Sequence, residues 1–238
     1  MIRNKHVIVP ACTLFILFEI WFSYQIQTVA PNLICSYQYS SVVLACIFGI
    51  LFFELSLKYA FTQIALVFTV LADYFLVYLD EIDQLNGMIC FSFVQIAYFA
   101  RIMLEDENKK RRKIHIYVRT ALSAVAMVFT FAVLQDKADA LAVVSVFYYA
   151  NLVLNLIFAF INFKKIYLMA FGFVFFILCD TVIGLACIGP YITIPEGSFI
   201  HILLHPGFDP AWAFYVPSYT LLSISLLPNR LQEQEKRV

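Results

Sequence analysis

The chain has 238 residues, of which 63% are hydrophobic and 13% are charged, with 16 basic and 16 acidic residues. Soluble domains are closer to half apolar and a quarter charged, so this composition excludes an ordinary soluble protein and predicts an integral membrane protein. The net charge of zero gives no general affinity for nucleic acid, and we predict no nucleic-acid partner.

Apolar stretches follow one another along the whole chain with only short polar breaks. A hydrocarbon core of about 30 Å needs roughly 20 apolar residues per helix. We therefore predict an all-α integral membrane protein, a bundle of eight transmembrane helices that forms a single domain over residues 1–238. The predicted spans are 7–27, 38–56, 59–79, 86–103, 114–134, 139–162, 165–188 and 210–228.

The first span has two readings. Arg3 and Lys5 precede an apolar run, and Thr28-Val29-Ala30 resembles a cleavage site, as in a signal peptide. However, Glu19 and Trp21 make the run longer and more mixed than a signal peptide usually is. We favour an uncleaved anchor.

The basic residues are distributed asymmetrically. In an eight-span model, all of the 16 Lys and Arg except Lys137 lie on one side, whereas the opposite loops are acidic. The positive-inside rule then places both termini in the cytoplasm. The block "EDENKKRRK" at 105–113 is a topology determinant, with anionic lipid headgroups as an alternative ligand. We predict a multi-pass protein of the bacterial inner (cytoplasmic) membrane.

Two acids interrupt the apolar spans at the same depth. The same spacing separates Lys58 from Asp73 and Lys165 from Asp180, in two spans that run in the same direction. At about 1.5 Å per residue, each acid lies about 22 Å from the cytoplasmic end of its helix. Glu19 falls in the same layer. Charged residues inside spans normally face the bundle interior or a wet cavity and mark functional sites.

Each acid could instead have a purely structural role, in which its protonated carboxyl joins two helices by a hydrogen bond. For Glu19 we expect this packing role. For Asp73 and Asp180, the equal depth favours a catalytic pair, because two carboxyls in a low-dielectric pocket provide an acid and a base near neutral pH. We expect the two carboxyls to lie within about 8 Å of each other.

Other polar residues are spaced to line the same cavity. Gln95 and Tyr98 share a face of the fourth span, Tyr148, Asn151 and Asn155 one of the sixth, and Tyr215, Ser218 and Tyr219 one of the eighth. The alternatives are an aromatic belt for the tyrosines and interhelical contacts for the asparagines. The candidate substrate-binding residues are Glu19, Gln95, Tyr98, Tyr149, Asn151, Tyr215 and Tyr219.

The sequence lacks the motifs of metal sites, serine hydrolases and phosphate-binding loops. His201 and His205 have helical zinc spacing, but the Glu of HExxH is missing and Gly and Pro surround the pair. The six cysteines show no CxxC spacing, and neither a GxSxG elbow nor a glycine-rich phosphate loop occurs. We predict no metal and no cofactor.

Five segments resemble the lysoplasmalogenase-like (YhhN-like) membrane family over nearly the whole chain. They are "ALVFTVLADYFLVYL", "FVQIAYFAR", "YYANLVLN", "GFVFFILCDTVIGLACI" and "FYVPSYTLLSIS". Ala72 stands where Gly is usual, Cys179 where Ser is usual and Tyr219 where Gln is expected. The first two changes keep small residues at close helix contacts, whereas the third removes an amide from the expected pocket.

The resemblance implies a hydrolase that cleaves the vinyl-ether bond of a lysophospholipid substrate, the lysoplasmalogen, to a fatty aldehyde and a glycerophospho-alcohol. Asp73 and Asp180 would then act as the acid and the base. A small-molecule or proton-coupled transporter is the main alternative, because acids inside spans also mark proton relays. A purely structural scaffold is the third reading. The oligomeric state is left open.

Overall fold

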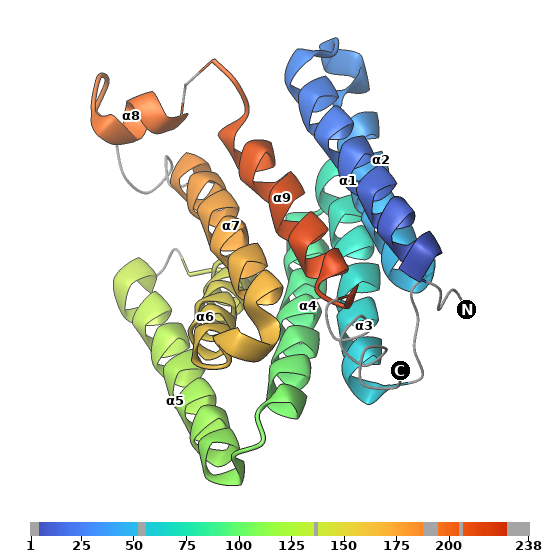
Figure 1. Cartoon of the computed structure of the whole chain (residues 1–238). Helices are drawn as coiled ribbons and strands as arrows, with labels where there is room; N and C mark the ends of the chain where they lie inside the picture. Colours follow the sequence, from blue (N-terminus) through green and yellow to red (C-terminus); the bar gives the residue numbers. More distant parts are fainter. Residues whose placement is uncertain (1–4, 52–55, 136–137, 188–194, 205–206, 228–238) are drawn as a thin grey trace.

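The computed structural model describes residues 5–51, 56–135, 138–187, 195–204 and 207–227, and its regular structure is entirely helical (Figure 1). The elements are α1 (Lys5–Thr28), α2 (Pro31–Leu51), α3 (Leu57–Asp73), the π-helical segment η1 (Tyr74–Tyr78), α4 (Gln84–Glu105), α5 (Lys109–Leu134), α6 (Ala140–Ile161), α7 (Phe163–Cys187), α8 (Phe199–Leu204) and α9 (Pro210–Ile224). The predicted all-α class is confirmed.

Seven helices in the described part of the chain are long and apolar enough to cross a membrane, as in a multi-pass membrane protein. They are α1, α2, α3 continued by η1, and α4 to α7. The eighth predicted span contains α9, which has 15 residues and packs along α7 (Figure 1). Eight crossings and cytoplasmic termini stay predictions, and residues 1–4 and 228–238 lie outside the described residues.

Some predicted boundaries were wrong. Helix α2 begins at Pro31 rather than at residue 38, because proline suits the first turn of a helix, where its missing N–H leaves no bond unmade. Helix α5 begins at Lys109 rather than 114. There the side chain of Asn108 accepts hydrogen bonds from the backbone N–H groups of Lys110 and Arg111. The predicted outer loop before α9 contains the short helix α8.

Aspartate side chains cap the N-termini of three of the other helices. Asp83, Asp139 and Asp209 accept hydrogen bonds from backbone N–H groups in the first turns of α4, α6 and α9. The backbone of Asp209 also makes two hydrogen bonds with the side-chain amide of Gln27, at 2.7 and 3.0 Å. These two bonds fix the start of α9 beside the end of α1.

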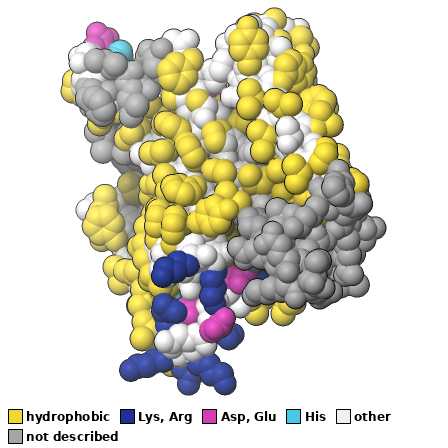
Figure 2. All heavy atoms as spheres, in the orientation of Figure 1, with side chains coloured by type: hydrophobic (Ala, Val, Ile, Leu, Met, Phe, Trp, Pro, Cys, Tyr) yellow, Lys and Arg dark blue, Asp and Glu magenta, His cyan; other side chains and the backbone are white. Residues whose placement is uncertain are grey.

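The helices pack as a bundle, and side chains from several helices form its interior. Helix α4 packs against α3 and α6, α7 packs against α6 and α9, and α9 also contacts α1 and α2. In Figure 2, hydrophobic side chains spread over the upper and middle part of the described surface, whereas Lys and Arg gather at the lower end, around the turn from α4 to α5. Exposed Val128 and Phe129 on α5 illustrate an apolar surface suited to lipid.

Ion pairs hold the charged end of the bundle together. Arg111 lies 2.6 Å from Asp106, and Lys165 at the start of α7 lies 2.6 Å from Glu107. The hydrogen bond and the charge of Lys165 hold the pKa of Glu107 below its usual value. The turn between α4 and α5 is thereby tied to α7.

Candidate active site

Asp73 is the last residue of α3 and is almost completely buried, at 3% exposure. The hydroxyl of Tyr215 on α9 donates a hydrogen bond of 2.6 Å to its Oδ2 atom. The chain passes into the π-helical segment η1 directly after Asp73, and such π turns often occur at functional sites. Asp73 therefore joins two helices that are far apart in the sequence.

Asp180 on α7 has a matching partner. The hydroxyl of Tyr148 on α6 donates to its Oδ2 atom at 2.5 Å. The neighbouring Tyr149 bonds instead to the hydroxyl of Thr181, at 2.9 Å. Each of the two acids thus receives one tyrosine hydroxyl from an adjacent helix.

Two phenylalanines connect the tyrosines of the two acids. The rings of Tyr148 and Tyr215 both pack against Phe91 on α4, at centroid distances of 5.6 and 6.5 Å. Both also pack against Phe176 on α7, at 6.4 and 5.7 Å. The structure therefore brings the two acids to one aromatic-lined region inside the bundle.

Glu19 lies in a separate polar contact next to this region. It is 2% exposed, and its Oε2 atom accepts hydrogen bonds from Ser41 at 2.5 Å and from Tyr219 at 3.3 Å. The ring of Tyr219 meets the ring of Tyr215 edge to face at 5.1 Å, one turn away on α9. Glu19 thus joins α1, α2 and α9.

A second polar cluster lies between α4, α5 and α6. The guanidinium of Arg119 donates to the side-chain oxygens of Asn151 and Asn155, at 2.5 Å each. Asn155 in turn donates to the side-chain oxygen of Gln95 at 2.9 Å. Gln95 and Asn151, both predicted to bind substrate, belong to this cluster and make these contacts rather than hydrogen bonds to the acids.

Two other predicted residues, Tyr98 and Ser218, lie in the packed interior. Tyr98 is buried and packs edge to face on Phe173 of α7, at 5.3 Å. Ser218 is fully buried on α9, and its hydroxyl has no hydrogen-bond partner in the part of the chain that the structure describes. His201 lies in α8, whereas His205 falls outside the described residues.

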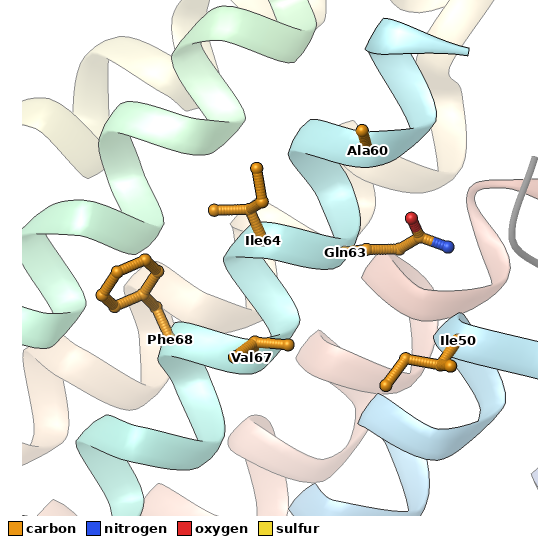
Figure 3. A pocket seen from close by; sticks show the side chains of 6 residues that line it. All are labelled: Ile50, Ala60, Gln63, Ile64, Val67 and Phe68. Carbon is orange, nitrogen blue, oxygen red and sulfur yellow. The ribbon is translucent and has the colours of Figure 1, made fainter. Parts of the chain in front are cut away.

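A surface groove of about 330 Å³ lies elsewhere, between α2 and α3 (Figure 3). Its lining residues are Ile50, Ala60, Gln63, Ile64, Val67 and Phe68, so it is almost entirely apolar. Neither acid belongs to this lining. The groove therefore adds no group to the chemistry of the acid pair.

Sequence reasoning missed the role of Arg119. The positive-inside count groups Arg119 with the cytoplasmic charges although it falls within the predicted span 114–134, and in the structure it lies well inside α5. The spacing of His115 and Arg119, four residues apart on one helical face, was the available signal. The Nη2 atom of Arg119 lies 3.4 Å from the ring Nε2 of His115.

Comparison with known proteins gives one family. The model of the YhhN family matches residues 33–199, which is well over half of the chain. The matched range includes Asp73, Tyr148 and Asp180, whereas Glu19 and Tyr215 lie outside it. No curated protein and no solved structure matches the chain.

Proposed function

Because the chain belongs to the YhhN family, the family of lysoplasmalogenases, we propose that it is a membrane-embedded hydrolase of lysoplasmalogens. It would cleave the vinyl-ether bond and release a fatty aldehyde and a glycerophospho-alcohol. The observation that carries this proposal is the pair of acids, Asp73 and Asp180, each bonded to a tyrosine hydroxyl beside the shared rings of Phe91 and Phe176.

The chemistry of a vinyl ether suits two carboxyl groups. A neutral carboxyl transfers its proton to the β-carbon, which forms a C–H bond and leaves an oxocarbenium ion. The other group, a carboxylate, stabilises the cation and takes a proton from water as the water oxygen bonds to the cationic carbon. The product of this step is a hemiacetal.

The hemiacetal then collapses. Its hydroxyl gives its proton to the group that first acted as the acid, while the protonated partner gives a proton to the leaving glycerol oxygen as the C–O bond breaks. Both carboxyls return to their starting states, and one water is consumed. Asp73 and Asp180 divide these roles between them, and the reaction needs no metal or other cofactor.

The tyrosines have a supporting part in this scheme. Tyr215 and Tyr148 each hold one oxygen of a carboxyl, which fixes the direction in which the other oxygen faces the substrate. The aromatic rings around them provide an apolar wall for the lipid. The substrate would reach the site sideways from the bilayer, in what we propose is a bacterial inner membrane.

Aldehyde release is the test of this function. Detergent-solubilised protein is supplied with a lysoplasmalogen or with the saturated ether lipid of the same headgroup and chain length. We expect aldehyde only from the vinyl ether, since a saturated ether has no double bond to protonate. If purified protein releases no aldehyde but moves a solute or protons across vesicle membranes, the transporter becomes the better account.

A further inference from the structure

Arg119 places a positive charge inside the candidate span formed by α5. Its side chain is 8% exposed, and its guanidinium lies over the ring of Phe99 at 4.2 Å. An ionisable residue within a span normally pairs with another charge or marks a ligand path. The structure must therefore compensate the charge of Arg119, which water would do for an arginine at the surface.

The described residues offer this cation no acid. The ion pairs among them join Arg101 and Lys58 to Glu105, Arg111 to Asp106 and Lys165 to Glu107, and none includes Arg119. The oxygens that Arg119 contacts are neutral amides, those of Asn151 and Asn155. The cluster, as described, keeps an uncompensated positive charge.

Two hydrogen-bond donors in this cluster also have no partner among the described residues. They are the Nε of Arg119 and the side-chain Nε2 of Gln95, both buried. Gln95 is itself fully buried, and Asn155 bridges it to Arg119. Buried donors are nearly always satisfied in native proteins, so these two indicate an absent acceptor. A positive charge with two free donors fits an anionic oxygen.

The cluster lies about one helical turn along α4 and α6 from residues that surround the proposed catalytic acids. Asn151 follows Tyr148 by three residues on α6, which is about 4.5 Å along the helix axis. On α4, Gln95 follows Phe91 by one turn, and Phe91 packs against Tyr148. On both α4 and α6, therefore, a residue of the Arg119 cluster lies about one turn from a residue of the acid site. In a lysophospholipid, only three carbons and one ester oxygen separate the ether oxygen from the phosphorus.

We propose that Arg119, assisted by Gln95, binds the phosphate diester of the lipid substrate while its vinyl ether lies at Asp73 and Asp180. This assignment rests on the proposed function. The Nη1 and Nη2 atoms of Arg119 already donate to Asn151 and Asn155, so the donors available to two phosphate oxygens are its Nε and the Nε2 of Gln95. The cluster would thus recognise the class of substrate, and the acids would act on its ether bond.

The kinetic test compares two vinyl ethers that differ only in the phosphate headgroup, a lysoplasmalogen and the matching alkenylglycerol. For Arg119→Gln we expect kcat/KM to fall about 10- to 100-fold with the lysoplasmalogen, because a charged hydrogen bond is lost. With the neutral alkenylglycerol it should change less than about threefold. An equal fall with both substrates would assign Arg119 a structural role and overturn the proposal.

Two further variants guard against loss of folding. Gln95→Glu keeps the oxygen that accepts from Asn155 and exchanges an unpartnered donor for a negative charge that neutralises Arg119. It should remove the preference for the phosphate-bearing substrate while Arg119 stays in place. Arg101→Gln removes another buried arginine, which pairs with Glu105, and should leave that preference unchanged. A preference that survives Gln95→Glu would contradict the proposal.

A binding measurement separates this proposal from the proposed function, because it requires no turnover. The melting temperature of the protein is followed with a saturated lysophospholipid, with the matching alkylglycerol and with inorganic phosphate. We expect the lysophospholipid to stabilise wild type more than the alkylglycerol does, and Arg119→Gln to abolish the difference. This result would stand even if no aldehyde were released. If only inorganic phosphate discriminates wild type from Arg119→Gln, the site binds a free anion and its assignment to the lipid is wrong.

Discussion

Replacing Tyr215 by phenylalanine removes one atom from the proposed active site. The hydroxyl lost is the one that donates to Asp73 at 2.6 Å. The ring remains, and with it the packing against Phe91, Phe176 and Tyr219. The variant therefore measures what the hydrogen bond to the carboxyl contributes, with little change in the bulk of the core.

The size of the effect follows from the kind of bond. A hydrogen bond to a charged group contributes about 1.5–3 kcal/mol, and each 1.36 kcal/mol corresponds to a tenfold change in rate. If the bond holds Asp73 in its reactive orientation, kcat/KM for lysoplasmalogen should fall about 10- to 150-fold. Tyr148→Phe should also slow turnover, because Tyr148 makes the matching bond to Asp180 at 2.5 Å. The loss should be smaller at whichever acid starts neutral, since a neutral hydrogen bond contributes about 0.5–1.5 kcal/mol.

The assay is aldehyde release by purified variants whose melting temperatures are measured alongside. Tyr167→Phe is the matched control, since Tyr167 lies on α7 at 41% exposure and packs on Phe163 at the other end of that helix. We expect it to retain wild-type turnover. Wild-type turnover by both Tyr215→Phe and Tyr148→Phe would refute the idea that these hydroxyls orient catalytic carboxyls.

Three further predictions concern packing, topology and Glu19. Gly172→Ala should lower stability by about 1–3 kcal/mol, because its new methyl group would lie 2.8 Å from Cγ of Leu222, whereas Gly184→Ala has nothing within 4 Å and should melt like wild type. A cysteine at position 110 should react with a membrane-impermeant maleimide in inverted vesicles only, and labelling in intact cells would reverse the orientation. Glu19→Gln should lower aldehyde release less than about tenfold, because the amide oxygen still accepts the bonds from α2 and α9; a loss as large as that of an Asp variant would make Glu19 catalytic.

The equal depth of the two acids stays a prediction, whereas the structure shows that the tyrosines bonded to them pack on the same two phenylalanines. Asp73 and Asp180 follow Lys58 and Lys165 at the same spacing, and parallel helices of equal rise bring such residues to one level. Helical periodicity also placed Tyr148 and Tyr215 on polar faces. These inferences needed no knowledge of which helix neighbours which.

The division of the polar residues into separate clusters could not be predicted in this way. Asn151 bonds to Arg119 on α5 and Gln95 bonds to Asn155 on α6, rather than to the acids, and this depends on how each helix is rotated and which helix lies next to it. The sequence gives the spacing along a helix but not these rotations. The contacts of Arg119 could not be predicted for the same reason, because they require α6 to present Asn151 and Asn155 to α5.

The most direct test of the central claim is aldehyde release from lysoplasmalogen by wild type, Asp73→Asn and Asp180→Asn, matched for thermal melting. Asparagine keeps the size of the side chain and can still join helices by a hydrogen bond, but it can neither donate the carboxyl proton nor carry the charge. We predict that wild type releases aldehyde and that each variant is about 10²- to 10⁴-fold slower, as expected for loss of a general acid or base. Turnover near the wild-type rate by both variants would contradict the catalytic role of the two acids.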